Sequence, residues 1–181
     1  MGNRGILHDA DRRIVRDWQV RRWIACRLEF RGRRRSVMTP GSYTELFFLD
    51  EAAALADGHR PCAECRHADY RAFQAAWRTA YPDAPVNADA IDRVLHAERR
   101  LRPFLKRTHF AQIDTLPDGS YVLLDGGAWL VRGESVWAWS ADRYVARAPR
   151  PTRTEVTLLT PPSIVSVLHA GYQPRRHPSC Q

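Results

Sequence analysis

The sequence predicts an α+β fold, in which a small N-terminal module with a short sheet and helices precedes an antiparallel β-meander module with a C-terminal helix. Three observations support this prediction. A Cys-x-x-Cys pair, Cys62 and Cys65, follows Pro61 at a turn between two helical patterns. After this pair, apolar residues recur every three or four positions, as on one face of a helix. From residue 108 onward, short apolar runs alternate with glycine-containing turns, a pattern typical of antiparallel strands.

The first module is predicted to span residues 1–81. Residues 1–17 contain few large apolar side chains and predict no particular element. Apolar and polar residues mostly alternate over 20–30, which predicts a half-buried strand with Cys26 facing inward, and residues 36–38 and 43–49 predict two further strands. Asp50 can cap a short helix that runs through Asp57, and Gly58 suits the left-handed conformation that ends it. The next helix is predicted over 67–81.

A connecting helix and the β module complete the predicted chain. Asp89 can cap a helix over 90–101, within a connecting region of residues 82–107. Apolar runs separated by glycine turns predict four antiparallel strands between residues 110 and 139. A further strand is predicted over 156–159, and Thr160 with Pro161 can begin the last helix, which Gly171 follows. The β module is therefore predicted to span residues 108–181.

Length and composition exclude several classes of protein. The chain of 181 residues has 44% hydrophobic and 27% charged residues, which is ordinary for a globular protein and argues against disorder. No apolar run is long enough to span a membrane, and charged residues occupy the N-terminus where a secretory signal needs an apolar stretch. We therefore expect a cytoplasmic protein with no membrane partner. In that reducing compartment, four cysteines favour metal binding or free thiols over disulfides.

The chain carries an excess of arginine. Its formal net charge is +8, and Lys106 is the only lysine. The planar guanidinium group suits phosphate recognition, so the excess predicts a nucleic-acid partner, with DNA favoured over RNA. A GC-rich genome would explain the same excess, because its codons favour arginine over lysine. The predicted contacts are the arginines of one basic turn and of the Cys-x-x-Cys segment, namely Arg33, Arg34, Arg35, Arg60 and Arg66.

Cys62 and Cys65 have the spacing at which two thiolates of one tight turn can bind the same zinc ion. A closed tetrahedral site needs two more ligands. Cys26 is the predicted third ligand, because its strand belongs to the module against which this turn packs, and His8 is the predicted fourth. A pair of free thiols or a redox couple is the alternative to a metal site. The alternatives to His8 are the two histidines that flank the pair, His59 and His67.

The pattern of this segment is shared with a known zinc module. In Ada-type DNA alkyl-phosphotriester repair proteins, the zinc-binding N-terminal module leads from a short helix through Ala-Gly-aromatic-Arg-Pro-Cys-x-x-Cys-Arg into another helix. Residues 48–66 resemble this module, with His59 at the aromatic position. The matching residues are Leu55-Ala56-Asp57-Gly58-His59-Arg60-Pro61-Cys62-Ala63-Glu64-Cys65-Arg66.

This resemblance implies zinc ligation by Cys62 and Cys65. The family binds zinc through four cysteines, and one of the two upstream cysteines accepts a methyl group. Here Cys26 is the only cysteine upstream of the pair. We therefore expect Cys26 to bind zinc as a buried ligand without accepting a methyl group.

The expected function is binding, with zinc mainly as a structural ion and an arginine-rich surface for nucleic acid. Two other classes stay open: a zinc-dependent enzyme, acting by alkyl-phosphotriester transfer or metal-assisted hydrolysis, and a protein–protein adaptor. The sequence contains no phosphate-cradling glycine loop, Gly-x-Ser-x-Gly elbow or His-Glu-x-x-His pattern. It therefore does not decide whether the chain is an enzyme.

Overall fold

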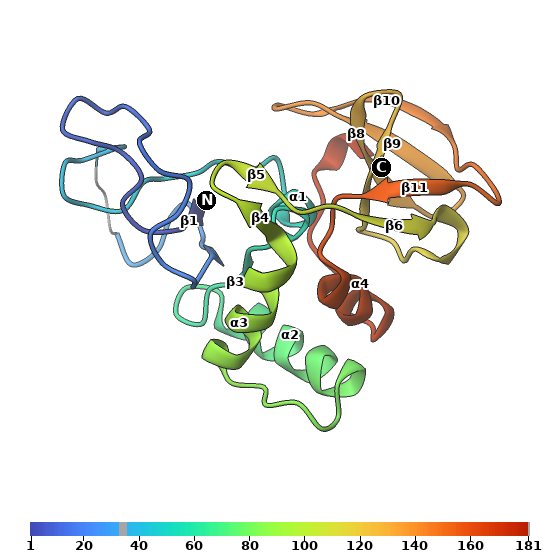
Figure 1. Cartoon of the computed structure of the whole chain (residues 1–181), viewed down its shortest axis with the longest axis horizontal. Coiled ribbons are helices and arrows are strands. Elements are labelled where there is room, and N and C mark those ends of the chain that lie inside the picture. The colour runs from blue at the N-terminus through green and yellow to red at the C-terminus, as the bar shows by residue number, and fades with distance from the viewer. Residues whose placement is uncertain (33–35, 181) are drawn as a thin grey trace.

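The protein has the predicted α+β fold, seen in a computed structural model that describes residues 1–32 and 36–180. A six-stranded sheet lies at one end of the molecule, the N-terminal segment lies at the other, and helices lie between them (Figure 1). No helix among the described residues combines the length and apolar character needed to cross a membrane. The α-helices of these residues are α1 (Glu51–Ala56), α2 (His67–Ala80), α3 (Ala88–Arg99) and α4 (Pro162–His169).

The large sheet is the predicted antiparallel meander with additions. Its strands are β6 (His109–Gln112), β7 (Tyr121–Leu124), β8 (Gly127–Arg132), β9 (Ser135–Trp139), β10 (Tyr144–Pro149) and β11 (Glu155–Leu158). They lie in the order β10-β9-β8-β7-β11-β6, so β11 inserts between β6 and β7. The sequence missed β10, whose residues between Tyr144 and Pro149 alternate only weakly, with small alanines in place of large apolar side chains. The first of the four strands predicted between residues 110 and 139 ends at Gln112, where a 3₁₀ helix (Ile113–Thr115) begins.

The N-terminal segment contains much less strand than the sequence predicted. A small sheet has the order β1-β2-β3, with β1 (Gly2–Asn3), β2 (Ile24–Ala25) and β3 (Arg60–Pro61). The predicted strand over 20–30 is therefore reduced to two residues, residues 36–38 form no strand, and residues 43–49 contribute a single bridge between Leu46 and Gly2. The alternation of apolar and polar residues did not produce a long strand, because each strand of this sheet pairs with only two residues of its neighbour. A separate hairpin joins β4 (Arg100–Arg102) to β5 (Leu105–Lys106).

Local capping chemistry explains where the helices begin and end. The Asp50 side chain accepts a backbone N–H of the first turn of α1, and Gly58 follows that helix with φ of +85°, as predicted. Asn87 caps α3, in place of the predicted Asp89. The side chain of Thr160 does not cap α4, because its hydroxyl oxygen accepts an N–H from β7.

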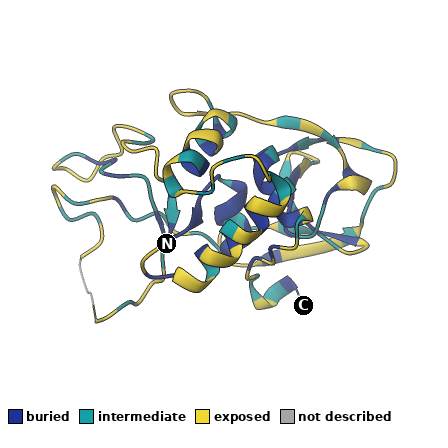
Figure 2. Ribbon diagram, turned by 90° about the horizontal axis from the view of Figure 1, so that it is seen from below, coloured by how far each residue is buried: buried dark blue, intermediate teal, exposed yellow. Residues whose placement is uncertain are grey.

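Three hydrophobic clusters form the core of the described part of the chain. One joins α1 and α2 to α3 and α4, one covers a face of the large sheet, and one packs α1 against the opposite face of that sheet. Figure 2 shows the buried residues gathered between the helices and the sheet, while the loops at the N-terminal end are largely exposed. The predicted division of the chain into modules at residues 81 and 107 stays a prediction. Two of these clusters contain residues from more than one of the predicted modules.

A buried tryptophan holds the N-terminal segment on the helices. The Trp23 ring lies between the guanidinium groups of Arg4 and Arg99, at 3.8 and 3.9 Å from the ring centroid. Arg99 also donates to the carbonyl oxygen of Gly58 (2.7 Å), and Lys106 donates to a carbonyl oxygen of α1 (2.7 Å). These cations tie α3 and the hairpin to the end of α1, directly before the cysteine turn.

Candidate metal centre

The parallel pairing of β2 and β3 brings Cys26 to the Cys-x-x-Cys turn. Ala25 lies opposite Pro61 in this pair, so residues 26 and 62 leave the sheet side by side. The Cys62 N–H donates to the carbonyl oxygen of Ala25 (3.0 Å), and the Cys26 N–H donates to that of Met1 (2.7 Å). β3 lies at the edge of its sheet, where Pro61 costs no ladder hydrogen bond.

A tight turn then returns the chain toward Cys26. The Arg66 N–H donates to the carbonyl oxygen of Cys62 (3.1 Å), and α2 begins with the next residue. Backbone N–H groups point at the sulfur atoms: that of Arg27 donates to the Cys65 sulfur (3.3 Å), and those of Glu64 and Cys65 donate to the Cys62 sulfur. Such donors favour the negatively charged thiolate, which is the form that binds metals.

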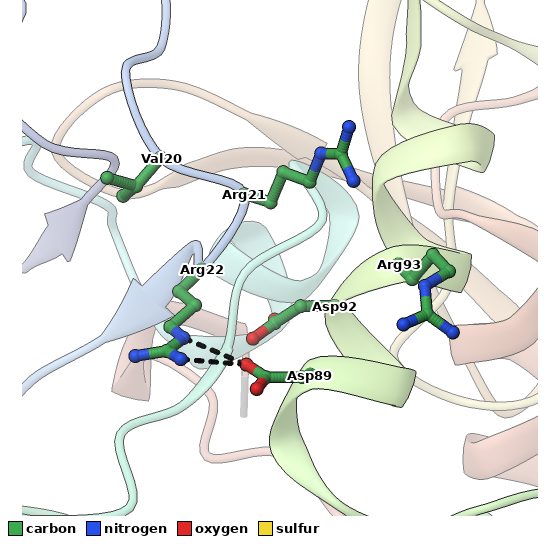
Figure 3. Close-up of a pocket in the computed structure, with 6 residues that line it drawn as sticks. All are labelled: Val20, Arg21, Arg22, Asp89, Asp92 and Arg93. Carbon is green, nitrogen blue, oxygen red and sulfur yellow. Dashed lines mark hydrogen bonds and ion pairs between the residues drawn. The ribbon is translucent and has the colours of Figure 1, made fainter.

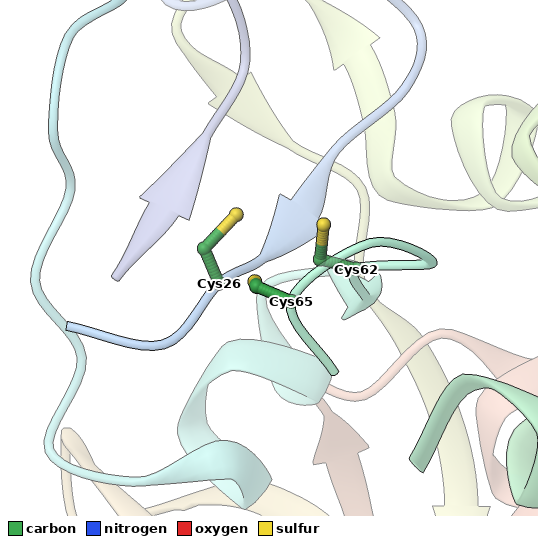
Figure 4. A group of neighbouring side chains, drawn as sticks. All are labelled: Cys26, Cys62 and Cys65. Carbon is green, nitrogen blue, oxygen red and sulfur yellow. The ribbon is translucent and has the colours of Figure 1, made fainter. Parts of the chain in front are cut away.

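The three sulfur atoms lie close enough together to hold one metal ion. All of them lie within 4.8 Å of one another, and the three cysteines are free of disulfides (Figure 4). In a tetrahedral zinc site with Zn–S bonds of about 2.3 Å, neighbouring sulfur atoms are about 3.8 Å apart. The cluster of Cys26, Cys62 and Cys65 can therefore accept a metal ion with a small inward movement of the side chains.

Hydrogen bonding within the cluster favours one thiolate. A hydrogen bond from the Cys26 thiol to the Cys62 sulfur lowers the pKa of Cys62 to about 5, and the backbone N–H donors act in the same direction. The same contact, together with burial, raises the pKa of Cys26. Burial raises the pKa of Cys65. A divalent cation would remove this difference in pKa among the three thiols, because it favours deprotonation of every thiol that binds it.

The cluster opens onto a cavity of about 790 Å³, which all three cysteines line. Among the described His, Cys, Asp and Glu side chains, no fourth ligand joins the three cysteines. Cys26 is half-buried, whereas Cys62 and Cys65 are buried, so Cys26 is the most accessible of the three. The mouth of the cavity has an apolar rim of exposed side chains, namely Leu28, Val37, Tyr43 and Phe47.

The structure does not bring His8 to the three sulfur atoms. Its Nδ1 lies 2.6 Å from the Thr44 hydroxyl oxygen, and the ring is buried there. His59 is fully buried as well, with its ring against Phe48 and Trp23, and burial lowers its pKa. His67 is exposed at the start of α2. None of these three histidines therefore joins the group of Cys26, Cys62 and Cys65.

The arginines predicted to bind nucleic acid have other roles where the structure describes them. Arg60 is buried and pairs with Asp92 of α3 through two hydrogen bonds (3.1 and 2.7 Å). Arg66 is buried and pairs with Glu51 (2.7 Å) and Asp69 (2.8 Å). This corrects the expectation for both residues, because carboxylates within the fold already satisfy their guanidinium groups. The predicted contacts Arg33, Arg34 and Arg35 lie outside the described residues.

Sequence reasoning missed a second cavity, of about 500 Å³, between residues 20–22 and α3 (Figure 3). Its exposed cations are Arg21 and Arg93, and Arg22 pairs with Asp89 across it (2.9 Å). Asp92 lies at its wall, already paired with Arg60. The only sequence signal for this groove is the Arg-Arg pair at 21–22, which does not show that a distant helix lies beside it.

Comparison with known proteins gives no further guidance. A scan against protein-family models, a search of curated proteins and a search of solved structures found no match to the chain. The functional conclusion therefore depends on the geometry of the site itself.

Proposed function

We propose that this chain is a zinc protein in which Cys26, Cys62 and Cys65 supply three thiolate ligands. The observation that carries the proposal is the convergence of three sulfur atoms to within 4.8 Å, from segments far apart in sequence. Thiolates are soft ligands that select zinc among the divalent ions that prefer tetrahedral sites. The N–H donors on two of the sulfur atoms support the same assignment, because they stabilise charge that buried free thiols would not carry.

The proposed role of zinc is mainly structural. Residues 1–50 contain four strand residues and no helix in the part that the structure describes, so regular secondary structure contributes little to holding this segment. A metal ion at the cluster would tie Cys26 directly to the turn that begins α2. Metal binding of this kind contributes to folding, because the unfolded chain offers no preformed site.

A second candidate function is alkyl transfer at Cys26, which the resemblance to Ada-type modules implies. The specific observation in its favour is the open side of the cluster, where the half-buried Cys26 lines the cavity. In this reaction the Cys26 thiolate would attack the methyl carbon of a methyl phosphotriester. The carbon–oxygen bond breaks, the sulfur keeps the methyl group as a thioether, and the phosphodiester leaves with the negative charge.

We further propose DNA as the partner of this protein. The support is its net charge of +8 and the arginines that lie exposed on described parts of the surface, including Arg27 beside the cluster and Arg21 and Arg93 at the second cavity. An excess of cations at this scale attracts polyanions through the release of their counterions. Affinity for DNA should therefore fall steeply as the salt concentration rises.

Metal analysis of the purified protein tests the first proposal. We expect about one zinc ion per chain, as a three-cysteine site requires. Cys62→Ser should abolish binding, whereas Cys180→Ser, which changes a buried cysteine outside the cluster, should retain the metal. A wild-type protein that stays metal-free when folded in the presence of zinc and a reducing agent would overturn the proposal.

Intact mass measurement separates the structural role from alkyl transfer. The protein is incubated with DNA that carries a methyl phosphotriester and is then weighed. A structural site predicts no change in mass. A gain of one methyl group that Cys26→Ser abolishes would show that the site is reactive and would reverse the assignment of Cys26 as a purely structural ligand.

A further inference from the structure

The hairpin of β4 and β5 combines positive charge with exposed apolar side chains. Residues 99–107 contain five arginine or lysine residues and no carboxylate. Phe104 at the tip is 66% exposed, and Leu101 is 60% exposed. Arg99, Arg100 and Lys106 make contacts within the fold, whereas the ring of Phe104 belongs to none of the three hydrophobic clusters, so core packing does not explain this exposed ring.

The backbone at Phe104 adopts a strained conformation at the tip of the hairpin. Phe104 has φ of +58°, a left-handed conformation that costs a residue with a side chain about 1–2 kcal/mol and that turns ordinarily assign to glycine or asparagine. The Phe104 N–H donates to the Asp17 carboxylate (2.9 Å), and Arg100 forms an ion pair with the same carboxylate. A strained aromatic residue that the structure fixes and leaves exposed indicates a functional contact.

The cations around the ring are available to a partner. Arg102 and Arg107 are exposed, and neither forms an ion pair with a carboxylate in the part of the chain that the structure describes. The side chain of Arg107 donates only to the carbonyl oxygen of Arg100 (3.2 Å). The hairpin therefore presents an exposed apolar ring at its tip and two unneutralised guanidinium groups, of which that of Arg107 lies at its base.

The second cavity, between residues 20–22 and α3, extends the positively charged surface of the hairpin along α3. Arg22 pairs with Asp89 near the start of α3, and Arg99 at its end donates to the carbonyl oxygen of Arg21 (2.5 Å). Residues 17–22 therefore follow α3 to the point where β4 begins. Figure 3 shows the cations of the groove, of which Arg21 and Arg93 are exposed and unpaired among the described residues.

We propose that this hairpin is a wedge for double-stranded DNA, an inference that rests on DNA as the partner proposed above. The Phe104 ring enters between two base pairs, Arg102 and Arg107 contact the flanking phosphates, and Arg21 and Arg93 contact phosphates further along. A two-stranded ribbon is narrow enough to enter a DNA groove, and apolar side chains flanked by arginine act as wedges at flexible base steps. The exposed cations of the hairpin and of the second cavity beside α3 suit a polyanion with several phosphates.

Binding to a short duplex with a central TA step tests the ring, with the zinc content measured in parallel. We expect Phe104→Ala to weaken binding about tenfold, as loss of one stacked aromatic contact does. Phe104→Gly removes the ring while suiting the left-handed backbone, so it should weaken binding equally without loss of stability. Phe110→Ala is the matched control, because this ring is 74% exposed on β6, and it should bind as wild type.

The salt dependence of binding tests the cations. Arg102→Gln with Arg107→Gln should reduce the slope of log affinity against log salt by about 2, since each lost phosphate contact contributes about 0.9. Arg71→Gln with Arg78→Gln removes the same charge from the exposed face of α2 and should leave most of the slope unchanged.

Other results of these binding experiments would overturn defined parts of the inference. If wild type binds DNA and both Phe104 variants bind equally well, the hairpin is not a wedge, although DNA stays the partner. If wild type carries zinc and binds no duplex, the DNA partner is wrong and the wedge with it. A ring-dependent affinity for single-stranded DNA alone, or for vesicles with anionic lipid in place of DNA, would likewise overturn a duplex wedge.

Discussion

Zinc at the three cysteines is expected to stabilise the protein mainly by closing a long loop. The 37 residues from Cys26 to Cys62 are joined through the metal, whereas Cys62 and Cys65 are only three positions apart. To bind the metal through all three thiolates, the unfolded chain must close a loop of this length at an entropy cost worth about 4 kcal/mol near room temperature, whereas the folded chain already holds the sulfur atoms together, so zinc favours the folded state. The local Cys62 to Cys65 closure adds little to this value. Loss of Cys26 should therefore remove most of the stabilisation by zinc.

Urea unfolding of the zinc-loaded protein, with and without a chelator, measures this contribution. Wild type should lose about 4 kcal/mol of unfolding free energy on chelation. Cys26→Ala should respond little to the chelator. Cys180→Ala is the matched control, because it also removes a buried sulfur but lies outside the cluster, and it should respond as wild type does.

Two results would refute this reasoning. If chelation lowers the unfolding free energy of wild type by less than about 1 kcal/mol, the size of an ordinary point mutation, the metal does not contribute substantially to stability. A full chelation effect in Cys26→Ala would show that Cys26 is not a ligand.

Three further predictions concern residues that the fold buries or strains. Asp92→Asn should reduce the unfolding free energy by about 3–5 kcal/mol, because it leaves the guanidinium group of Arg60 buried without a charged partner; a variant as stable as wild type in urea would contradict this. Burial lowers the pKa of Lys106 from 10.5 to about 7, so the unfolded chain binds the proton more tightly and stability should rise between about pH 7 and pH 10, by at most about 5 kcal/mol. Lys106→Met should remove this rise in thermal unfolding measured across that range, and an unchanged slope would contradict the assignment. Phe104→Gly should raise the unfolding free energy by about 1–2 kcal/mol relative to Phe104→Ala, through relief of the left-handed backbone; equal midpoints in thermal unfolding would count against strain.

The sequence predicted the cysteine turn well because its signals are local. The cap at Asp50, the left-handed Gly58 and the Cys-x-x-Cys spacing all act within a few residues, and each is present in the structure as predicted. The meander was predictable for the same reason, since glycine turns and apolar runs are adjacent in the chain. The strand over 20–30 was overextended, because alternation shows what a strand would bury but not how much partner backbone it finds.

The partners of charged and metal-binding side chains were less predictable. Arg60 looked like a surface cation, yet its partner Asp92 lies 32 positions later and reaches it only when α3 packs beside the turn. His8 looked like a ligand because its segment needed an anchor, yet the ring bonds to Thr44 instead. In both cases the deciding contact joins segments that carry no local signal for each other.

The sequence by itself determined that Cys62 and Cys65 share one turn between two helices, and that a β-meander follows. Cys26 was a prediction among open alternatives, and the tertiary structure places it in the cluster, since its position depends on the parallel register of β2 and β3. The tertiary structure also decided which arginines are internal and which, at the hairpin and along α3, face solvent. The physical reason is that turns and caps are set by short-range backbone chemistry, whereas burial and ion pairing depend on which distant segments meet when the core forms.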